Sequence, residues 1–135
     1  MELVEIGRVQ SPLTDAASAP KQGDEGAPEA WLVFADRFAP GLENIQPMDE
    51  VFVLTWLDRA RRDVLRVHPR GDPSRPEQGV FSTRSPSRPN PIGLHRVQII
   101  AIDANRFRVR NLEALDGTPI IDIKPLLKGS DSADR

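Results

Sequence analysis

The chain has no cysteine and only two histidines among its 135 residues. Without a thiol, a disulfide framework, a thiolate metal site and a cysteine nucleophile are all excluded. The two histidines, His68 and His95, stand too far apart in the sequence to form a local metal-binding motif. We therefore expect no metal centre in this protein.

Long apolar runs are missing as well. No segment approaches the roughly 18 apolar residues that are typical of a membrane-spanning helix. The opening residues, MELVEIGRV, lack the charged start and apolar stretch of a secretory signal. The expected location is the cytoplasm.

Several catalytic motifs are also absent. There is no GxGxxG pattern and no P-loop, so a doubly wound nucleotide-binding fold is not supported. There is no GxSxG or HExxH motif, which excludes a nucleophile elbow and a zincin site. Carboxylates occur in pairs, but nothing in the sequence places a pair at the separation that glycosidases use.

The chain is instead rich in turn formers, with thirteen prolines and nine glycines. This composition favours short strands joined by turns, and the length predicts one domain at 1–128 followed by a flexible tail at 129–135. A long loop is expected at 11–30 and one helical turn within 37–45. Strands are expected at 3–9, 31–34, 51–57, 64–68, 94–103 and 107–110. The predicted fold class is therefore mainly β.

Charge is unevenly distributed along the chain. Residues 1–58 carry a balance of −8, whereas residues 59–110 carry twelve arginines against four acidic residues, a balance of +8. Arginine favours planar, forked contacts to carboxylate or phosphate. One interpretation is an anion-binding segment, and the other is that the two halves pack together and neutralise each other. The pI near 5.7 is lower than is usual for a nucleic-acid-binding protein.

The stretch STRSPSRPNPIGL at 82–94 combines three prolines with two arginines and an asparagine. Each proline fixes φ and biases the residue before it toward an extended conformation. Such a loop is either a rigid connection or a pre-organised clamp, which displays Arg88 and Asn90 to a substrate at little entropic cost. A second short stretch, LDGTP at 115–119, is typical of a turn because it contains Asp-Gly.

Taken together, these stretches resemble one known family. The segments GVFSTRSPSRPNPIGL (79–94) and LEALDGTPIIDIKPLL (112–127), with IGRVQSP (6–12) and PKQG (20–23), are similar to the TrmO (TsaA-like) family. The resemblance implies a small β-barrel, unlike Rossmann-type methyltransferases, that works as a homodimer and uses S-adenosyl-L-methionine. It also implies methylation of the exocyclic nitrogen of threonylcarbamoyl-adenosine beside the tRNA anticodon.

The resemblance further implies which residues bind the cofactor. These are Pro20, Lys21, Gln22, Asp58, Arg59, Arg84, Leu94, Asn111, Leu112, Glu113 and Ala114. Arg84 suits the carboxylate of the cofactor, and backbone groups near Leu94 and 112–114 suit its adenine. If the acceptor nitrogen must lose a proton, the candidate bases are Asp58, Glu113 and Asp116. Asp116 is preferred among these three, although a structural role in the turn is favoured over a catalytic one for this residue.

Two departures from the family pattern bear on the substrate. Asp58 stands where the family commonly has a histidine, which changes the charge beside the expected cofactor pocket. The chain also stops near residue 135, whereas larger members continue into a domain that helps hold tRNA. Three hypotheses follow: a tRNA methyltransferase, a methyltransferase acting on a small molecule, and a non-catalytic nucleic-acid-binding barrel.

Overall fold

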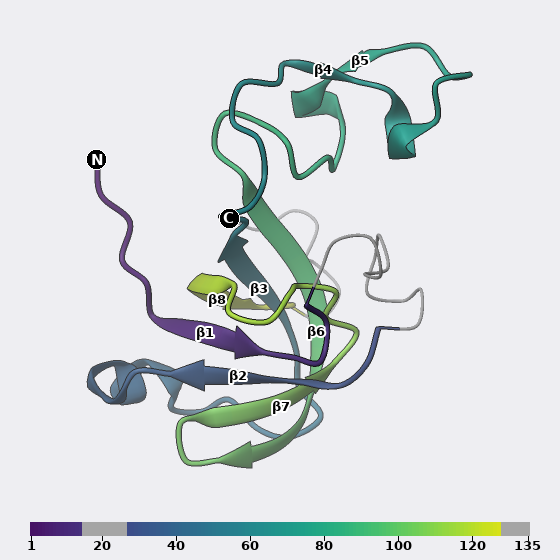
Figure 1. Cartoon of the computed structure of the whole chain (residues 1–135). Coiled ribbons are helices and arrows are strands. Elements are labelled where there is room, and N and C mark those ends of the chain that lie inside the picture. The colour runs from purple at the N-terminus through teal and green to yellow at the C-terminus, as the bar shows by residue number, and fades with distance from the viewer. Residues whose placement is uncertain (15–26, 128–135) are drawn as a thin grey trace.

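The computed structural model describes residues 1–14 and 27–127. Within these residues, six strands form one antiparallel sheet: β1 (Gly7–Gln10), β2 (Ala30–Phe34), β3 (Glu50–Trp56), β6 (Ile92–Asp103), β7 (Arg106–Arg110) and β8 (Pro119–Pro125) (Figure 1). Two short strands, β4 (Arg66–Val67) and β5 (Gln78–Gly79), pair with each other. The described connections hold 3-10 helices at η2 (Asp36–Leu42), η3 (Pro69–Gly71) and η4 (Val80–Ser82). None of these helices is long and apolar enough to cross a bilayer.

The six-stranded sheet closes on itself. Its hydrogen-bonded order is β1-β2-β7-β6-β3-β8, and β8 also pairs with β1 through Gly7–Ile120 and Arg8–Pro119. Every strand of this closed barrel therefore has two neighbours, which removes the exposed edges of an open sheet. The prediction of a mainly β fold that is not Rossmann-like is confirmed.

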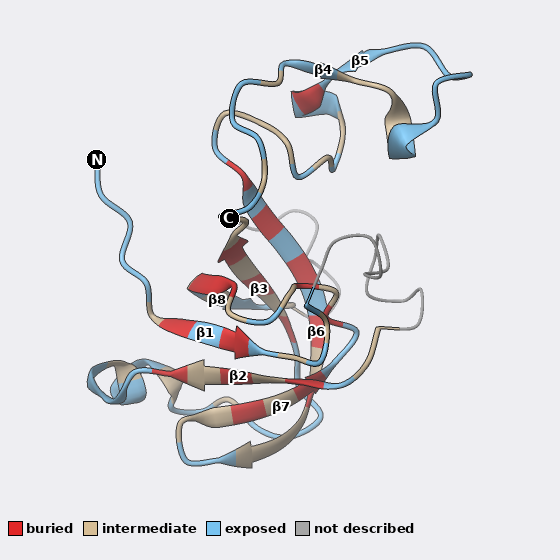
Figure 2. Ribbon diagram, in the orientation of Figure 1, coloured by how far each residue is buried: buried red, intermediate tan, exposed pale blue. Residues whose placement is uncertain are grey.

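The core fills the inside of this sheet because side chains alternate between its two faces. Figure 2 shows the alternation of buried and exposed residues along β6. In β7, Phe107 and Val109 are buried, whereas the arginines that alternate with them are not. Phe107 meets Phe34 of β2 edge to face, with the ring centroids 5.3 Å apart. Apolar burial on both strands therefore fixes their register.

Residues 57–91 form an arm that leaves the barrel at the end of β3 and returns at the start of β6 (Figure 1). Most of the arm is exposed in Figure 2, and Val80 and Pro91 are its buried residues among those described. The arm is closed at its base, where the Leu57 amide donates to the Pro91 carbonyl at 2.8 Å. Its two ends therefore enter and leave the sheet side by side.

The element boundaries differ from the prediction in three places. The first strand begins at Gly7 rather than at residue 3, and the strand expected at 64–68 shrinks to the two residues of β4. Strand β8 was not predicted from the sequence. The expected tail and most of the expected loop at 11–30 lie outside the described residues. The other predicted strands and the helical turn are confirmed within a few residues.

Candidate functional site

Part of the predicted cofactor set lies around the end of β3. Asp58 and Arg59 occupy the exposed turn that follows this strand, and Arg59 Nη1 donates to the carbonyl of Thr14 at 2.9 Å. This bond joins the turn to the beginning of the early loop. Pro20, Lys21 and Gln22 of that loop lie outside the described residues.

The two arginines of the proline loop lie in opposite environments. The guanidinium of Arg88 is half-buried, where Nη2 donates to the carbonyl of Thr83 at 2.6 Å and to that of Val80. The Arg88 amide also donates to the Arg61 carbonyl at 3.0 Å. Arg84 is exposed and forms no hydrogen bond or ion pair with any described residue. Arg88 therefore holds the loop in shape, and Arg84 is the arginine that the loop displays.

Asn90 lies at the base of the arm beside an aromatic ring. Its Oδ1 accepts a hydrogen bond from Arg62 Nη2 at 3.2 Å, and the Arg62 guanidinium lies 5.1 Å from the centroid of Trp56. These three residues line a groove of about 440 Å³, whose other walls include Ile92 and Glu5. The proline loop therefore borders a groove between the arm and the barrel.

A larger hollow of about 740 Å³ lies elsewhere, and it is lined by residues that include Asn44, Glu50 and Arg96. Among the predicted site residues that the structure describes, none lines it. Among the described residues, no group of three or more histidines and carboxylates is placed to hold a metal ion.

Leu94, another predicted cofactor residue, points outward from β6 and is 42% exposed. It stands opposite Leu54 in the register of β3 and β6, and the next outward pair is Trp56 with Ile92, which is 40% exposed. We call these four residues the outer patch. An apolar cluster on the outside of a sheet is typical of an interaction surface.

The segment 111–114 turns the chain inward after β7. Asn111 has φ of 71°, a left-handed conformation that reverses the direction of the backbone. The side chains of Leu112 and Ala114 are buried in the core, at 0% and 4% exposed. Only the backbone of these two residues remains to reach a ligand. Glu113, between them, has its side chain 20% exposed.

A chain of polar contacts runs from Glu113 into the barrel. Glu113 Oε1 lies 2.6 Å from His95 Nδ1, and His95 Nε2 lies 2.6 Å from the hydroxyl of Thr55. Thr55 and His95 are 0% and 4% exposed. We call these three residues the relay. Sequence reasoning missed Thr55 and His95, because residues 40 positions apart are brought together only by the pairing of β3 with β6.

Asp116 has a structural role in the turn at 115–119. Its carboxylate accepts a hydrogen bond from the amide of Ser11 at 2.9 Å, and its own amide donates to the carbonyl of Leu13 at 2.7 Å. Gly117 next to it has φ of 83°, as a tight Asp-Gly turn requires. These contacts match the structural alternative to the predicted catalytic role, which stays a prediction.

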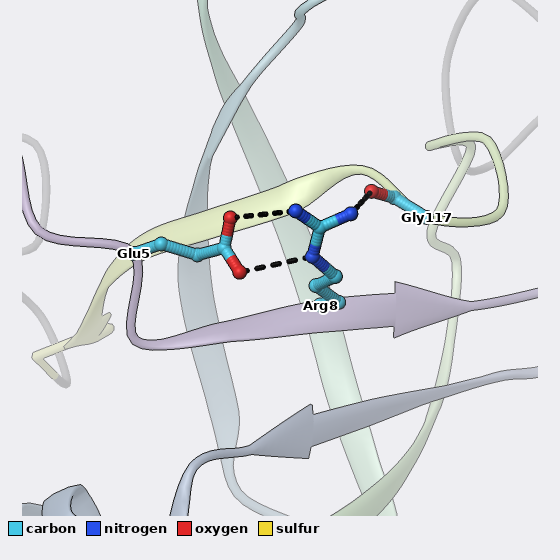
Figure 3. A network of polar contacts seen from close by, with 3 residues as sticks. All are labelled: Glu5, Arg8 and Gly117. Carbon is cyan, nitrogen blue, oxygen red and sulfur yellow. Dashed lines mark hydrogen bonds and ion pairs between the residues drawn. The ribbon is translucent and has the colours of Figure 1, made fainter.

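An ion pair supports the same turn. Figure 3 shows the carboxylate of Glu5 receiving two bonds from Arg8, at 2.9 and 3.0 Å, while Arg8 Nη1 donates to the Gly117 carbonyl at 3.4 Å. The hydrogen bond and charge of Glu5 raise the pKa of Arg8, and the negative charge of Asp58 adds to this rise. Asp58 therefore lies near enough to the Arg8–Glu5 pair to act on the charge of Arg8.

The comparisons with known proteins cover nearly the whole chain. The family model for the tRNA-methyltransferase O N-terminal domain matches residues 8–132. An S-adenosyl-L-methionine-binding protein of Archaeoglobus fulgidus is 48% identical over 124 residues, which are 92% of this chain and 88% of that protein. A probable S-adenosyl-L-methionine-binding protein of Methanothermobacter thermautotrophicus is 42% identical, over 94% of this chain and 90% of the relative.

Solved structures of TrmO resemble the chain in fold. The crystal structure of TrmO from Pseudomonas aeruginosa matches all of this chain with a TM-score of 0.77 and 28% identity. A further TrmO crystal structure matches with a TM-score of 0.78, also at 28% identity. The chain spans 60% and 62% of the length of those two chains.

Proposed function

Because the chain belongs to the tRNA-methyltransferase O family, we propose that it is an S-adenosyl-L-methionine-dependent methyltransferase that acts on tRNA. The proposed acceptor is the exocyclic nitrogen of threonylcarbamoyl-adenosine beside the anticodon, and a tRNA acceptor implies a cytoplasmic location. The names of the relatives from Archaeoglobus and Methanothermobacter support the choice of methyl donor.

The donor and acceptor groups at the site suit this cofactor. S-adenosyl-L-methionine carries a carboxylate, an ammonium group, a sulfonium and an adenine. The exposed guanidinium of Arg84 suits the carboxylate, and the exposed carboxylate of Asp58 suits the ammonium group. The backbone at 112–114 is available for adenine, since two of its side chains point into the core. The observation that carries the proposal is the display of Arg84 on a loop that Arg88 holds in shape.

When bound, the cofactor supplies a methyl group attached to a good leaving group. The protein contributes mainly by holding the acceptor in line with that methyl group, and such positioning accounts for a large share of the rate. A loop that is rigid before binding loses little entropy when the ligand arrives. The prolines of residues 86–91 and the bonds of Arg88 provide this rigidity.

Replacing Arg84 with alanine is expected to weaken cofactor binding by about 1.5–3 kcal/mol, roughly 10- to 150-fold in Kd, because one charged hydrogen bond is lost. Arg66→Ala is the matched control, since Arg66 is also an exposed arginine of the arm. Calorimetric titration of each variant with S-adenosyl-L-methionine measures the effect. Equal Kd values for Arg84→Ala and the wild type would remove Arg84 from the site.

A second candidate is methyl transfer to a small molecule. Asp58 in the turn after β3 favours it, since an exposed carboxylate repels phosphate, and the net charge of the chain is −2. Activity toward isolated metabolites with none toward tRNA would select this candidate.

We further propose that the protein works as a homodimer through the outer patch. Leu94 and Ile92 are too exposed for core residues, and their partners on β3 extend the apolar surface across two strands. Burial of such a surface against a second copy removes it from water. Because Leu94 also belongs to the predicted cofactor set, this interface lies next to the cofactor site.

Leu94→Glu is expected to convert the dimer to a monomer, because it places a charge in the centre of an apolar contact. Leu65→Glu on the arm is the control, since Leu65 is also exposed, at 63%. Sedimentation velocity distinguishes the two states. A wild type that sediments as a monomer at micromolar concentration would contradict the proposed dimer.

A further inference from the structure

We propose that Glu113 is the base that accepts the proton of the acceptor nitrogen, and that Thr55 and His95 are positioning residues that aim its carboxylate. This inference rests on the proposed function. It starts from the three residues of the relay, whose two contacts of 2.6 Å connect the barrel interior to the half-buried carboxylate.

The direction of the two hydrogen bonds follows from burial. The hydroxyl of Thr55 is fully buried, and His95 Nε2 is its one side-chain or backbone acceptor among the described residues. A buried hydroxyl that does not donate is costly, so Thr55 donates its proton to Nε2. His95 Nε2 is then an acceptor and its proton lies on Nδ1, which donates to Glu113 Oε1.

The geometry leaves one carboxylate oxygen available. Glu113 Oε1 is bound to His95, whereas Oε2 has no partner within residues 1–14 and 27–127. The side chain as a whole is 20% exposed, so Glu113 stands between the buried His95 and the solvent. His95 therefore holds one oxygen in place and leaves the other to accept a proton.

The backbone around the relay is adapted to it. Thr55 stands opposite Gly93 in the β3–β6 pairing. A Cβ atom at Gly93 would lie 2.4 Å from the Thr55 hydroxyl and 2.6 Å from His95 Nε2, so only glycine leaves room for their contact. The β3–β8 register also shifts between Leu54 and Thr55, and such bulges commonly re-aim side chains next to active sites.

The relay also distinguishes among Asp58, Glu113 and Asp116, the three candidate bases that the sequence alone could not rank. Asp116 binds the backbone of Ser11, and Asp58 is exposed in a turn with no side chain that orients it among those described. Glu113 alone has a buried partner that is itself fixed by a third group. This arrangement of a reacting group, a histidine and an orienting residue is the geometric signature of a positioned acid–base group.

Deprotonation matters for this acceptor because its lone pair is delocalised into the neighbouring carbonyl and ring. In the proposed step, the carbon–nitrogen bond forms while the carbon–sulfur bond breaks, and the electron pair of that bond remains on sulfur. The proton leaves nitrogen for Glu113 Oε2, so a neutral methylated product and a protonated carboxyl result. A positioned base of this kind typically contributes about 10²- to 10⁴-fold in rate.

The experiment measures methyl transfer from S-adenosyl-L-methionine to tRNA that carries threonylcarbamoyl-adenosine. Glu113→Gln is expected to lower kcat by about 10²-fold or more while KM for tRNA and the cofactor Kd change less than about threefold. Glu50→Gln is the control, because Glu50 is an exposed, ion-paired carboxylate in β3. Wild-type kcat in Glu113→Gln would overturn the inference.

Two further variants test the positioning role. Thr55→Val keeps the shape of the side chain but removes its hydroxyl donor, and we expect this variant to have a lower kcat than the wild type. Thr55→Ser keeps the hydroxyl, and we expect its kcat to stay near the wild-type value. A role in packing alone predicts the reverse, because valine fills the site better than serine does. The ¹⁵N signals of the His95 ring in the free wild-type protein give a readout without catalysis: a proton on Nδ1 supports the relay, and a proton on Nε2 overturns it.

The possible outcomes distinguish a failure of the proposed role of Glu113 from a failure of the proposed methyltransferase function. A wild type that transfers no methyl group to tRNA would end both. A wild type that does so, with Glu113→Gln equally active, would end the inference and leave the proposed function standing.

Discussion

Raising the salt concentration from 50 to 200 mM is expected to lower the affinity for tRNA by about 10²-fold or more. The arm carries eight arginines against four acidic residues, although the whole chain has a net charge of −2. The exposed arginines of the arm outside the expected cofactor set are Arg61, Arg62, Arg66, Arg70 and Arg75. Contacts of these side chains with phosphates release bound counterions, and that release makes the affinity depend steeply on salt.

A salt series of filter-binding measurements tests this prediction. Exchanging Arg66 and Arg75 for glutamine is expected to make the slope of log K against log salt shallower by about two, one for each lost phosphate contact. The matching change of Gln98 and Gln46 on the barrel to alanine leaves the charge unaltered and serves as the control. A nearly flat salt dependence in the wild type would mean that the arm does not meet phosphate, and it would favour the small-molecule acceptor.

Phe107→Ala is expected to lower the free energy of unfolding by about 3–5 kcal/mol. Phe107 is 1% exposed on the inner face of β7, and its ring packs edge to face on Phe34 from the neighbouring strand. Alanine removes the apolar area of the ring and leaves a cavity that the closed sheet cannot easily collapse. This loss is a large fraction of the stability that a single small domain possesses.

Urea denaturation measures this effect, and the chain offers a control of the same residue type. Phe81 in η4 is 78% exposed, so Phe81→Ala is expected to change stability by less than about 0.5 kcal/mol. A loss below about 1 kcal/mol for Phe107→Ala would show that the centre of the core lies elsewhere. Equal losses of unfolding free energy for Phe107→Ala and Phe81→Ala would contradict the assignment of Phe107 to the core and Phe81 to the surface.

Local patterns predicted those strands whose side chains alternate clearly. The run Arg106 to Arg110 places its apolar residues on one face, and β3 is dense in β-branched and aromatic residues. Strand β8 escaped prediction because its sequence, PIIDIKP, begins and ends with proline and follows directly on a turn. It is held as a strand by pairing with β1 and β3, which are distant in sequence.

The candidate site also has parts that the sequence predicted and parts that it did not. The proline motif identified the loop, but its sequence did not show that Arg88 turns inward to the Val80 and Thr83 carbonyls while Arg84 faces solvent. Glu113 came from the family resemblance. Its partners His95 and Thr55 could not be predicted from the sequence, because the relay depends on strand register and on the space beside Gly93. Contacts of this kind are non-local, and short motifs do not contain them.

The claim that this chain is a tRNA methyltransferase is tested most directly by the nucleosides of its product. The measurement incubates the protein with isotopically labelled S-adenosyl-L-methionine and tRNA from cells that lack their own enzyme of this family, followed by mass spectrometry of the digested tRNA. We predict that the label appears on threonylcarbamoyl-adenosine, and that this nucleoside becomes heavier by one methyl group. Unchanged nucleosides and unlabelled tRNA would contradict the account.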